Sequence, residues 1–238
     1  MKRFWSEVTV VAVEAGEAGA GGFTIRLDRR PVRTPAKAPC LLPTRALAEA
    51  VAAEWAAVEG VVDPAAMPLT RAANSAIDRV TPERAAVAAT IAAYGEADLI
   101  CYRAPHPQVL ARRQADAWDP LVAWAARALG ADLVLAEGVV HVAQSPESLA
   151  RLGAAVRAHG AWELTALHDL VSISGSLVIG LAVSHGHLDA ATAWPLARID
   201  EDWNFEEWGE DAEAAAVAAR RRADFLNASR LLELVRAR

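Results

Sequence analysis

The apolar residues change their spacing at Thr44, and this change limits what the chain can fold into more than any other feature of the sequence. Residues 8–15 (VTVVAVEA) and 21–36 (GGFTIRLDRRPVRTPA) are rich in β-branched residues, which indicates strands. From Thr44 the spacing becomes helical, with Leu47 and Val51 four residues apart, and it stays helical almost to the C-terminus. Thr44 itself is a suitable N-cap for the first helix.

Strands followed by helices predict a segregated α+β architecture. We expect a small N-terminal β-rich α/β domain over residues 1–75 and a larger C-terminal helical bundle over residues 76–238. Within the second part, the uncharged run 170–183 (LVSISGSLVIGLAV) predicts a buried central helix, whose Gly175 and Gly180 would let a neighbouring helix approach closely. A membrane span needs about 20 residues, so this run is too short to cross a bilayer.

Two helix features follow from local residue preferences. Thr81 precedes a proline and a glutamate, so we predict that it is the N-cap of a helix. Pro120 lies inside a helical pattern that ends at Gly130, and we expect it to kink or divide that helix.

The sequence carries no recognisable catalytic, nucleotide or metal motif. The glycines of residues 16–22 (GEAGAGG) precede a strand-like segment rather than a helix, which favours a hairpin over a phosphate loop. His185 and His187 lack a nearby third ligand, so they indicate a loop at a helix end. Cys40 and Cys101 are far apart and are expected to be buried thiols of a reducing compartment. We therefore expect no cofactor, no metal and no catalytic residue.

The charge and the start of the chain restrict partners and location. The net charge of −6 argues against a general nucleic-acid partner, because phosphate contacts need clustered Lys and Arg. The first residues show no apolar signal core, and we expect a soluble chain without membrane insertion.

Residues 200–214 (DEDWNFEEWGEDAEA) place eight carboxylates beside two tryptophans and a phenylalanine. On a helix, Ile199 and Trp203 would share an apolar stripe, whereas like charges four residues apart repel and stay solvated. Such a segment is a solvated helix face, a protein-binding surface in which Trp is a favoured anchor, or the carboxylate pair of a hydrolase. We favour the binding surface, and a carboxylate-dependent hydrolase using residues 200–213 is the alternative.

Seven phrases, in their order along the chain, carry a family resemblance. They are RFW from Arg3, LDRRPVRTPA from Leu27, LPTRALAEAVAAEWAA from Leu42, MPLTRAANSAID from Met67, DLICYRA from Asp98, QADAWDPLVAW from Gln114 and RIDEDWNFEEWGEDAEA from Arg198. From Arg3 to about Leu234 the chain resembles the assembly chaperone family of the F-type ATP synthase α subunit, known from mitochondria and alphaproteobacteria.

The resemblance implies a chaperone that is not an enzyme. It would bind the unassembled α subunit of the catalytic sector and protect it from aggregation until the β subunit replaces it. The family fold is also two-part, with a small α/β domain and a helical bundle. The resemblance further implies no cofactor, no nucleic-acid partner, a monomer when free, and a bacterial cytoplasmic location, with relatives in the mitochondrial matrix.

The charged and aromatic phrase is the family's C-terminal signature. Carried onto this sequence, it makes five residues candidates for partner contact: Glu201, Asp202, Trp208, Glu210 and Asp211. Because the acids are expected to be solvated, reversing their charge should weaken capture of the client at little cost in stability. Trp208 is expected to serve packing as well as binding.

Overall fold

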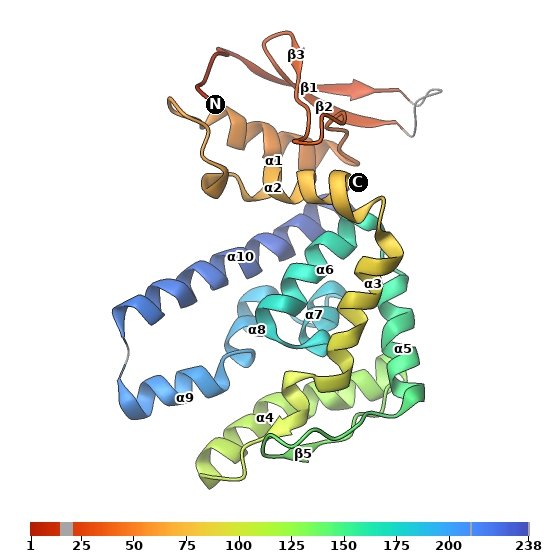
Figure 1. Ribbon diagram of the computed structural model, residues 1–238, viewed down its shortest axis with the longest axis vertical. Helices are drawn as coiled ribbons and strands as arrows, with labels where there is room; N and C mark the ends of the chain where they lie inside the picture. The colour runs from red at the N-terminus through yellow and green to blue at the C-terminus, as the bar shows by residue number, and fades with distance from the viewer. Residues whose placement is uncertain (15–20, 210, 238) are drawn as a thin grey trace. The chain divides into compact units, whose positions relative to one another are not determined.

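The computed structural model describes residues 1–14, 21–209 and 211–237 (Figure 1). The chain divides into two compact units. The first comprises Met1–Arg84, Ala161–Ala166 and Arg230–Arg238, and the second comprises Ala85–Gly160 and Leu167–Ser229. A three-stranded sheet belongs to the first unit and the second is mainly helical, which confirms the predicted α+β class. The predicted domain boundary between residues 75 and 76 stays a prediction.

The N-terminal sheet is antiparallel, in the order β1 (Val8–Val13), β2 (Gly22–Leu27) and β3 (Arg30–Pro31). The predicted glycine turn falls largely on residues 15–20, which lie outside the described residues. The antiparallel register of β1 and β2 is the one that a hairpin connection requires.

Two side-chain caps fix the helices beside this sheet. In α1 (Arg45–Ala56) the hydroxyl of Thr44 accepts from the Leu47 N–H at 3.1 Å, so the predicted N-cap is confirmed. The same hydroxyl donates to the Leu234 carbonyl at 2.6 Å, within the first unit. A short helix η1 (Pro64–Ala66) leads to α2 (Pro68–Ser75), whose first N–H groups donate to the Glu54 carboxylate of α1. A buried face that includes Leu47 and Val51 packs α1 into the core of this unit.

The prediction that Thr81 caps a helix is wrong. The chain passes from α2 into the π-helical turn η2 (Ala76–Val80), and the Thr81 hydroxyl donates back to the Ala76 carbonyl at 2.7 Å. Because the backbone is already helical before Thr81, its hydroxyl serves the end of one turn and not the start of another. Helix α3 then begins at Arg84 (Arg84–Ala92).

The remaining elements have the following bounds: η3 Ala93–Ala97, η4 Leu99–Cys101, β4 Tyr102–Arg103, α4 Gln108–Trp124, η5 Ala125–Leu129, β5 Ala136–Glu137, α5 Pro146–Arg157, α6 Ala161–Ser174, α7 Leu177–Ser184, α8 Ala190–Leu196, α9 Ile199–Trp208 and α10 Ala212–Arg236. Strands β4 and β5 pair in parallel over two residues each. Pro120 does not divide α4, because buried Trp118 and Leu121 on either side of it pack in one continuous helix.

Helix α7 is the centre of the helical unit, and all its residues are buried. The prediction of one central helix over 170–183 is wrong, because the chain breaks at Gly175, whose φ is +71°. The Ser176 hydroxyl accepts from the Ile179 N–H at 3.0 Å and caps α7 as a separate helix. The predicted close approach at Gly180 is confirmed, since a Cβ there would lie 2.5 Å from Cγ2 of Val171 in α6.

Asp98 lies at the start of η4 and is fully buried. Its carboxylate accepts from the Ile100 N–H at 3.2 Å and from the Val178 N–H at 2.9 Å, which joins η4 to the N-terminus of α7. Burial raises the pKa of Asp98 to about 6, while hydrogen bonds from Ser176 and from these N–H groups act in the opposite direction.

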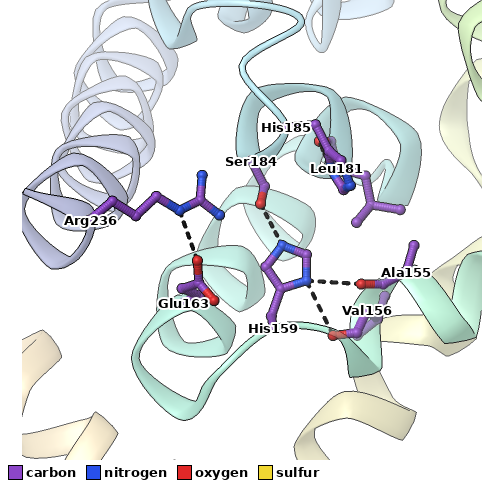
Figure 2. A network of polar contacts seen from close by, with 8 residues as sticks. All are labelled: Ala155, Val156, His159, Glu163, Leu181, Ser184, His185 and Arg236. Carbon is purple, nitrogen blue, oxygen red and sulfur yellow. Dashed lines mark hydrogen bonds and ion pairs between the residues drawn. The ribbon is translucent and has the colours of Figure 1, made fainter. Parts of the chain in front are cut away.

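A histidine holds the other end of α7 (Figure 2). The Nδ1 atom of His159 lies 2.9 Å from the Ala155 carbonyl oxygen, which can only accept, so Nδ1 carries a proton. Its Nε2 lies 2.6 Å from the Ser184 hydroxyl at the end of α7. The next residue, His185, follows the helix end, and the ring of His187 stacks on Trp124, so the predicted helix-ending loop is confirmed. Figure 2 also shows an ion pair of the first unit, between Arg236 and Glu163 at 2.8 Å.

Over residues 1–14, 21–209 and 211–237, no helix combines the length and the apolar character needed to cross a membrane.

The contact at Gly180 can be tested by adding one methyl group. Gly180→Ala should lower the free energy of unfolding by about 1–3 kcal/mol, because the new Cβ overlaps Val171 in a filled core. The matched control is Gly153→Ala in α5, whose Cβ would lie 2.9 Å from the flexible end of Arg157 and at an ordinary contact distance of 3.8 Å from the Ala92 Cβ. The control should be neutral or more stable by up to about 1 kcal/mol. Equal stability of the two variants in denaturant unfolding would contradict the close helix packing.

The buried carboxylate should give a defined pH dependence. Between about pH 4 and pH 6 the folded protein keeps the Asp98 proton while the unfolded chain, with its ordinary value of 3.8, loses it. The Asp98 contribution to the free energy of unfolding is therefore fully present at low pH and falls by about 3 kcal/mol as the pH rises through about 6. Asp98→Asn cannot titrate, so the difference in stability between parent and variant should shrink over this window. A difference that does not change with pH would refute the assignment.

Candidate protein-binding surface

The acidic-aromatic segment, residues 200–214, forms most of α9 and the first turn of α10. Helix α9 ends at Gly209, whose φ of +87° is a conformation that glycine adopts without strain. Glu210 lies outside the described residues, and α10 begins at Ala212.

Arg198 connects α8 to α9 through contacts of its buried side chain. The residue is only 8% exposed, and its guanidinium binds the Asp202 carboxylate at 3.0 Å one helical turn later. The guanidinium carbon also lies 5.5 Å from the Trp194 ring centre and 5.6 Å from that of Phe205. Trp194 packs on Phe225 of α10. One arginine thus binds an acid and two aromatic rings of α8 and α9 together.

Helix α4 supports α9 through two polar side chains. Buried Gln114 donates to the Asp200 carboxylate at 2.6 Å, and Arg113 binds both Glu206 oxygens at 2.8 Å. The expectation that the acids stay solvated is therefore wrong for part-buried Asp200, whereas the Glu206 side chain is paired and still 55% exposed. A basic or amide partner from elsewhere in the fold faces each carboxylate.

A tryptophan of α4 fixes the helix before α9. Trp118 is fully buried, and its indole N–H donates to the Leu196 carbonyl at 2.7 Å, at the end of α8. Trp118 is therefore part of the core of the helical unit.

The five predicted partner-binding residues have different environments. Glu201 is half-buried, Asp202 is held by Arg198, and Asp211 is exposed, with its carboxylate accepting from the Glu213 N–H at 3.3 Å. Trp208 is 86% exposed, which contradicts the expected packing role and leaves a large indole facing solvent. Glu210 lies outside the described residues.

Two hollows adjoin the segment. A cavity of about 310 Å³ is lined by Trp194, Arg198, Asp200, Glu201 and Arg221, together with the Ile173–Gly175 turn. An open groove of about 370 Å³ separates α9 from α10, and Glu201, Phe205, Asp211, Glu213 and Val217 line it. Glu201 and Asp211 thus face the same groove, although the sequence alone does not bring them together.

The cavity does not supply the carboxylate pair that the alternative hydrolase needs. A glycosidase-like reaction needs two carboxylates facing one another across a cleft. In the cavity, Asp200 and Glu201 are consecutive on one helix and point in different directions, and Asp200 already accepts from Gln114. Among the described residues, no cluster of three or more His, Cys, Asp or Glu side chains could hold a metal ion.

Sequence reasoning missed the residues that order the surface, above all Arg198, Arg113 and Gln114. One signal was present, because Arg198 precedes Asp202 by four residues and such pairs meet on a helix. Arg113 and Gln114 gave no local signal, since their partners lie far along the chain.

Comparison with known proteins identifies the chain. The model of a family described as ATP12 chaperone protein matches residues 2–126, which is more than half of the sequence. The chain belongs to the ATP12 chaperone family. Its structure is similar to the crystal structure of Atp12 from Paracoccus denitrificans, with a TM-score of 0.93 and 50% identity, covering 99% of this chain and 98% of that one.

Two other relatives extend the comparison. A solved structure from Agrobacterium tumefaciens is 44% identical, with a TM-score of 0.91, and covers 98% of this chain and 85% of that one. The mitochondrial protein atp12 of Schizosaccharomyces pombe is 24% identical over 225 residues, which are 89% of this chain and 75% of that protein. The acidic-aromatic segment lies beyond the matched family region, but the Paracoccus structure covers nearly all of this ATP12-family chaperone.

The role of Arg198 can be measured by a double-mutant cycle with Arg198→Met and Asp202→Asn. We expect a coupling energy of about 1–2 kcal/mol, because Arg198 is buried while solvent still reaches and screens Asp202. The matched control is Arg113→Met with Glu206→Gln, whose side chains are 39% and 55% exposed. That cycle should give less than about 1 kcal/mol. Equal coupling in denaturant unfolding would remove Arg198 from its organising role.

Proposed function

We propose that this ATP12-family chaperone acts in assembly of the F-type ATP synthase, where it binds the unassembled α subunit. It holds the α subunit until the β subunit takes its place, and it carries out no chemical reaction. Membership of the ATP12 chaperone family carries the proposal. The phrase-by-phrase resemblance supports the α subunit as the client.

The physical task of such a chaperone is to cover apolar surface for a limited time. A ring subunit exposes its interfaces before its neighbours arrive, and exposed apolar patches drive aggregation. The chaperone must bind more weakly than the final neighbour, and a difference of about 3 kcal/mol already gives more than a 100-fold preference for exchange. Charged residues around the contact speed association without adding much affinity.

We propose Glu201, Asp202, Trp208, Glu210 and Asp211 as the partner-binding residues. Trp208 supplies the exposed aromatic anchor, and Glu201 and Asp211 supply charge around it. Asp202 contributes indirectly, because it holds Arg198 and with it the rings of Trp194 and Phe205.

We place this activity in the bacterial cytoplasm and propose that the free chaperone is a monomer. The Paracoccus and Agrobacterium relatives support a bacterial source, and the Schizosaccharomyces relative is named as mitochondrial.

Co-expression with the α subunit alone tests the proposed function. The α subunit should stay in the soluble fraction and co-purify with the chaperone, and added β subunit should release it. The control is co-expression of the β subunit alone, which should gain no solubility. If the α subunit aggregates equally with and without the chaperone, the proposed client is wrong.

Trp208→Ala should weaken capture of the α subunit by about tenfold or more, as expected for an aromatic anchor. Because the indole is 86% exposed, the free energy of unfolding should change by less than about 0.5 kcal/mol. The matched control is Val139→Ala, which removes a 96% exposed apolar side chain from another part of the same unit. Pull-down titration measures capture, and normal capture by Trp208→Ala would exclude the indole as the anchor.

A further inference from the structure

The groove between α9 and α10 combines an apolar floor with acidic walls. Phe205 of α9 and the Ala214, Val217 and Ala218 side of α10 form the apolar part. Val217 is 44% exposed, so the groove presents apolar surface to solvent. The two helices face one another in Figure 1. The groove lies within one compact unit, so it does not depend on the placement of the other unit.

The arginines at the groove have partners within the protein, whereas two of its carboxylates form no ion pair. Arg198 is bound to Asp202, and Arg221 donates to the Ile173 carbonyl at 2.7 Å, so both guanidinium groups have partners inside the protein. Glu201 and Glu213, which also line the groove, form no ion pair within residues 1–14, 21–209 and 211–237. Arg221 keeps its positive charge, because a carbonyl group does not neutralise it, but Glu201, Asp211 and Glu213 outnumber it, so the groove presents net negative charge to an incoming side chain.

The exposed aromatic ring continues this surface. Trp208 lies one helical turn beyond Phe205 on α9, and its indole faces solvent. A ligand that filled the groove and extended past the end of α9 would meet this ring. Because residues three apart lie on the same side of a helix, the Trp208 indole extends the apolar surface of Phe205 beyond the groove.

We propose that the α9–α10 groove binds an amphipathic client segment in which apolar side chains alternate with lysine or arginine. The apolar side chains pack on Phe205 and Val217, and the basic side chains reach Glu201 and Glu213. A groove between two helices is a recurrent site for an amphipathic helix, which inserts one apolar face. The identity of the client rests on the proposed function, whereas the chemistry of the segment rests on the groove.

Charge complementarity favours a basic amphipathic segment over an acidic or a purely apolar one. A segment bearing acids would bring like charges to the groove walls, and a purely apolar segment would leave the wall carboxylates without partners. A basic amphipathic segment satisfies both the apolar floor and the acids. Because the walls are solvent-accessible, such pairing adds specificity and association rate more than affinity, which suits a complex that must later be exchanged.

A synthetic peptide tests the chemistry without the client. The probe is a fluorescent peptide with leucine and lysine at amphipathic helical spacing, and its counterpart carries glutamate in place of each lysine. The full-length chain should bind the lysine peptide and not the glutamate peptide in a fluorescence anisotropy titration. Binding of both peptides alike, or of neither, would overturn the proposal.

Two pairs of variants localise the binding. Glu201→Lys and Val217→Glu change the groove, whereas Glu207→Lys on the same helix and Val109→Glu on α4 change exposed residues that do not line it. The groove variants should weaken lysine-peptide binding by about tenfold or more, and the controls by less than about threefold. In about 1 M salt, where the Debye length falls to about 3 Å, the Glu201→Lys effect should shrink because solvent-accessible charges are screened. The effect of Val217→Glu, which removes apolar contact, should persist.

The outcomes separate this inference from the proposed function. If Glu207→Lys weakens binding as much as Glu201→Lys does, the peptide senses net charge and the groove assignment is wrong. If the chaperone keeps the α subunit soluble and the groove variants do so equally well, the groove proposal fails while the function stands. If the α subunit is not held but the peptide binds in the groove, the proposed client fails and the groove proposal stands. Thermal unfolding of each variant ensures that only folded proteins are compared.

Discussion

The buried carboxylate of Asp98 is the interaction on which the helical unit depends. Removing a carboxylate from water is unfavourable unless donors surround it, and here the N–H groups of Ile100 and Val178 supply them. These bonds fix the start of α7, the fully buried central helix. They also set the turn beside it, where the Leu99 N–H donates to the Gly175 carbonyl at 3.2 Å. Leu99 and Gly175 line the cavity below α9, so one core interaction extends to the candidate binding surface.

The acids of residues 200–214 fall into two groups, those that are paired within the protein and those that are available at the surface. Asp202 and Asp200 accept bonds from Arg198 and Gln114, and these bonds hold α9 in place. Glu201 and other acids remain available at the surface. The same composition thus supplies both the support of the helix and its external charge. This division explains how a segment with so many carboxylates can be a stable helix despite their mutual repulsion.

A chaperone of a subunit that must later join a ring needs limited affinity. The α9–α10 groove suits that need, because it is open and its carboxylates are reached by solvent. The contacts of one exposed indole and a shallow groove give specificity, while the absence of a deep, closed pocket at the groove allows exchange by a partner with a larger interface. We infer that selection of the client depends on the pattern of charge and apolar side chains more than on buried area.

The order of strands and helices, the cap at Thr44, the helix end at Gly209 and the close contact at Gly180 follow from residues that are near one another along the chain. These features depend on neighbours within a few residues, where hydrophobic period, hydroxyl caps and missing side chains act directly. The two-part fold and the family were also predictable. The break at Gly175, the exposure of Trp208 and the pairing of particular acids become visible only in the folded protein. Those outcomes depend on partners brought close by folding, such as Gln114 and Asp200, and the spacing of residues along one segment carries no information about them.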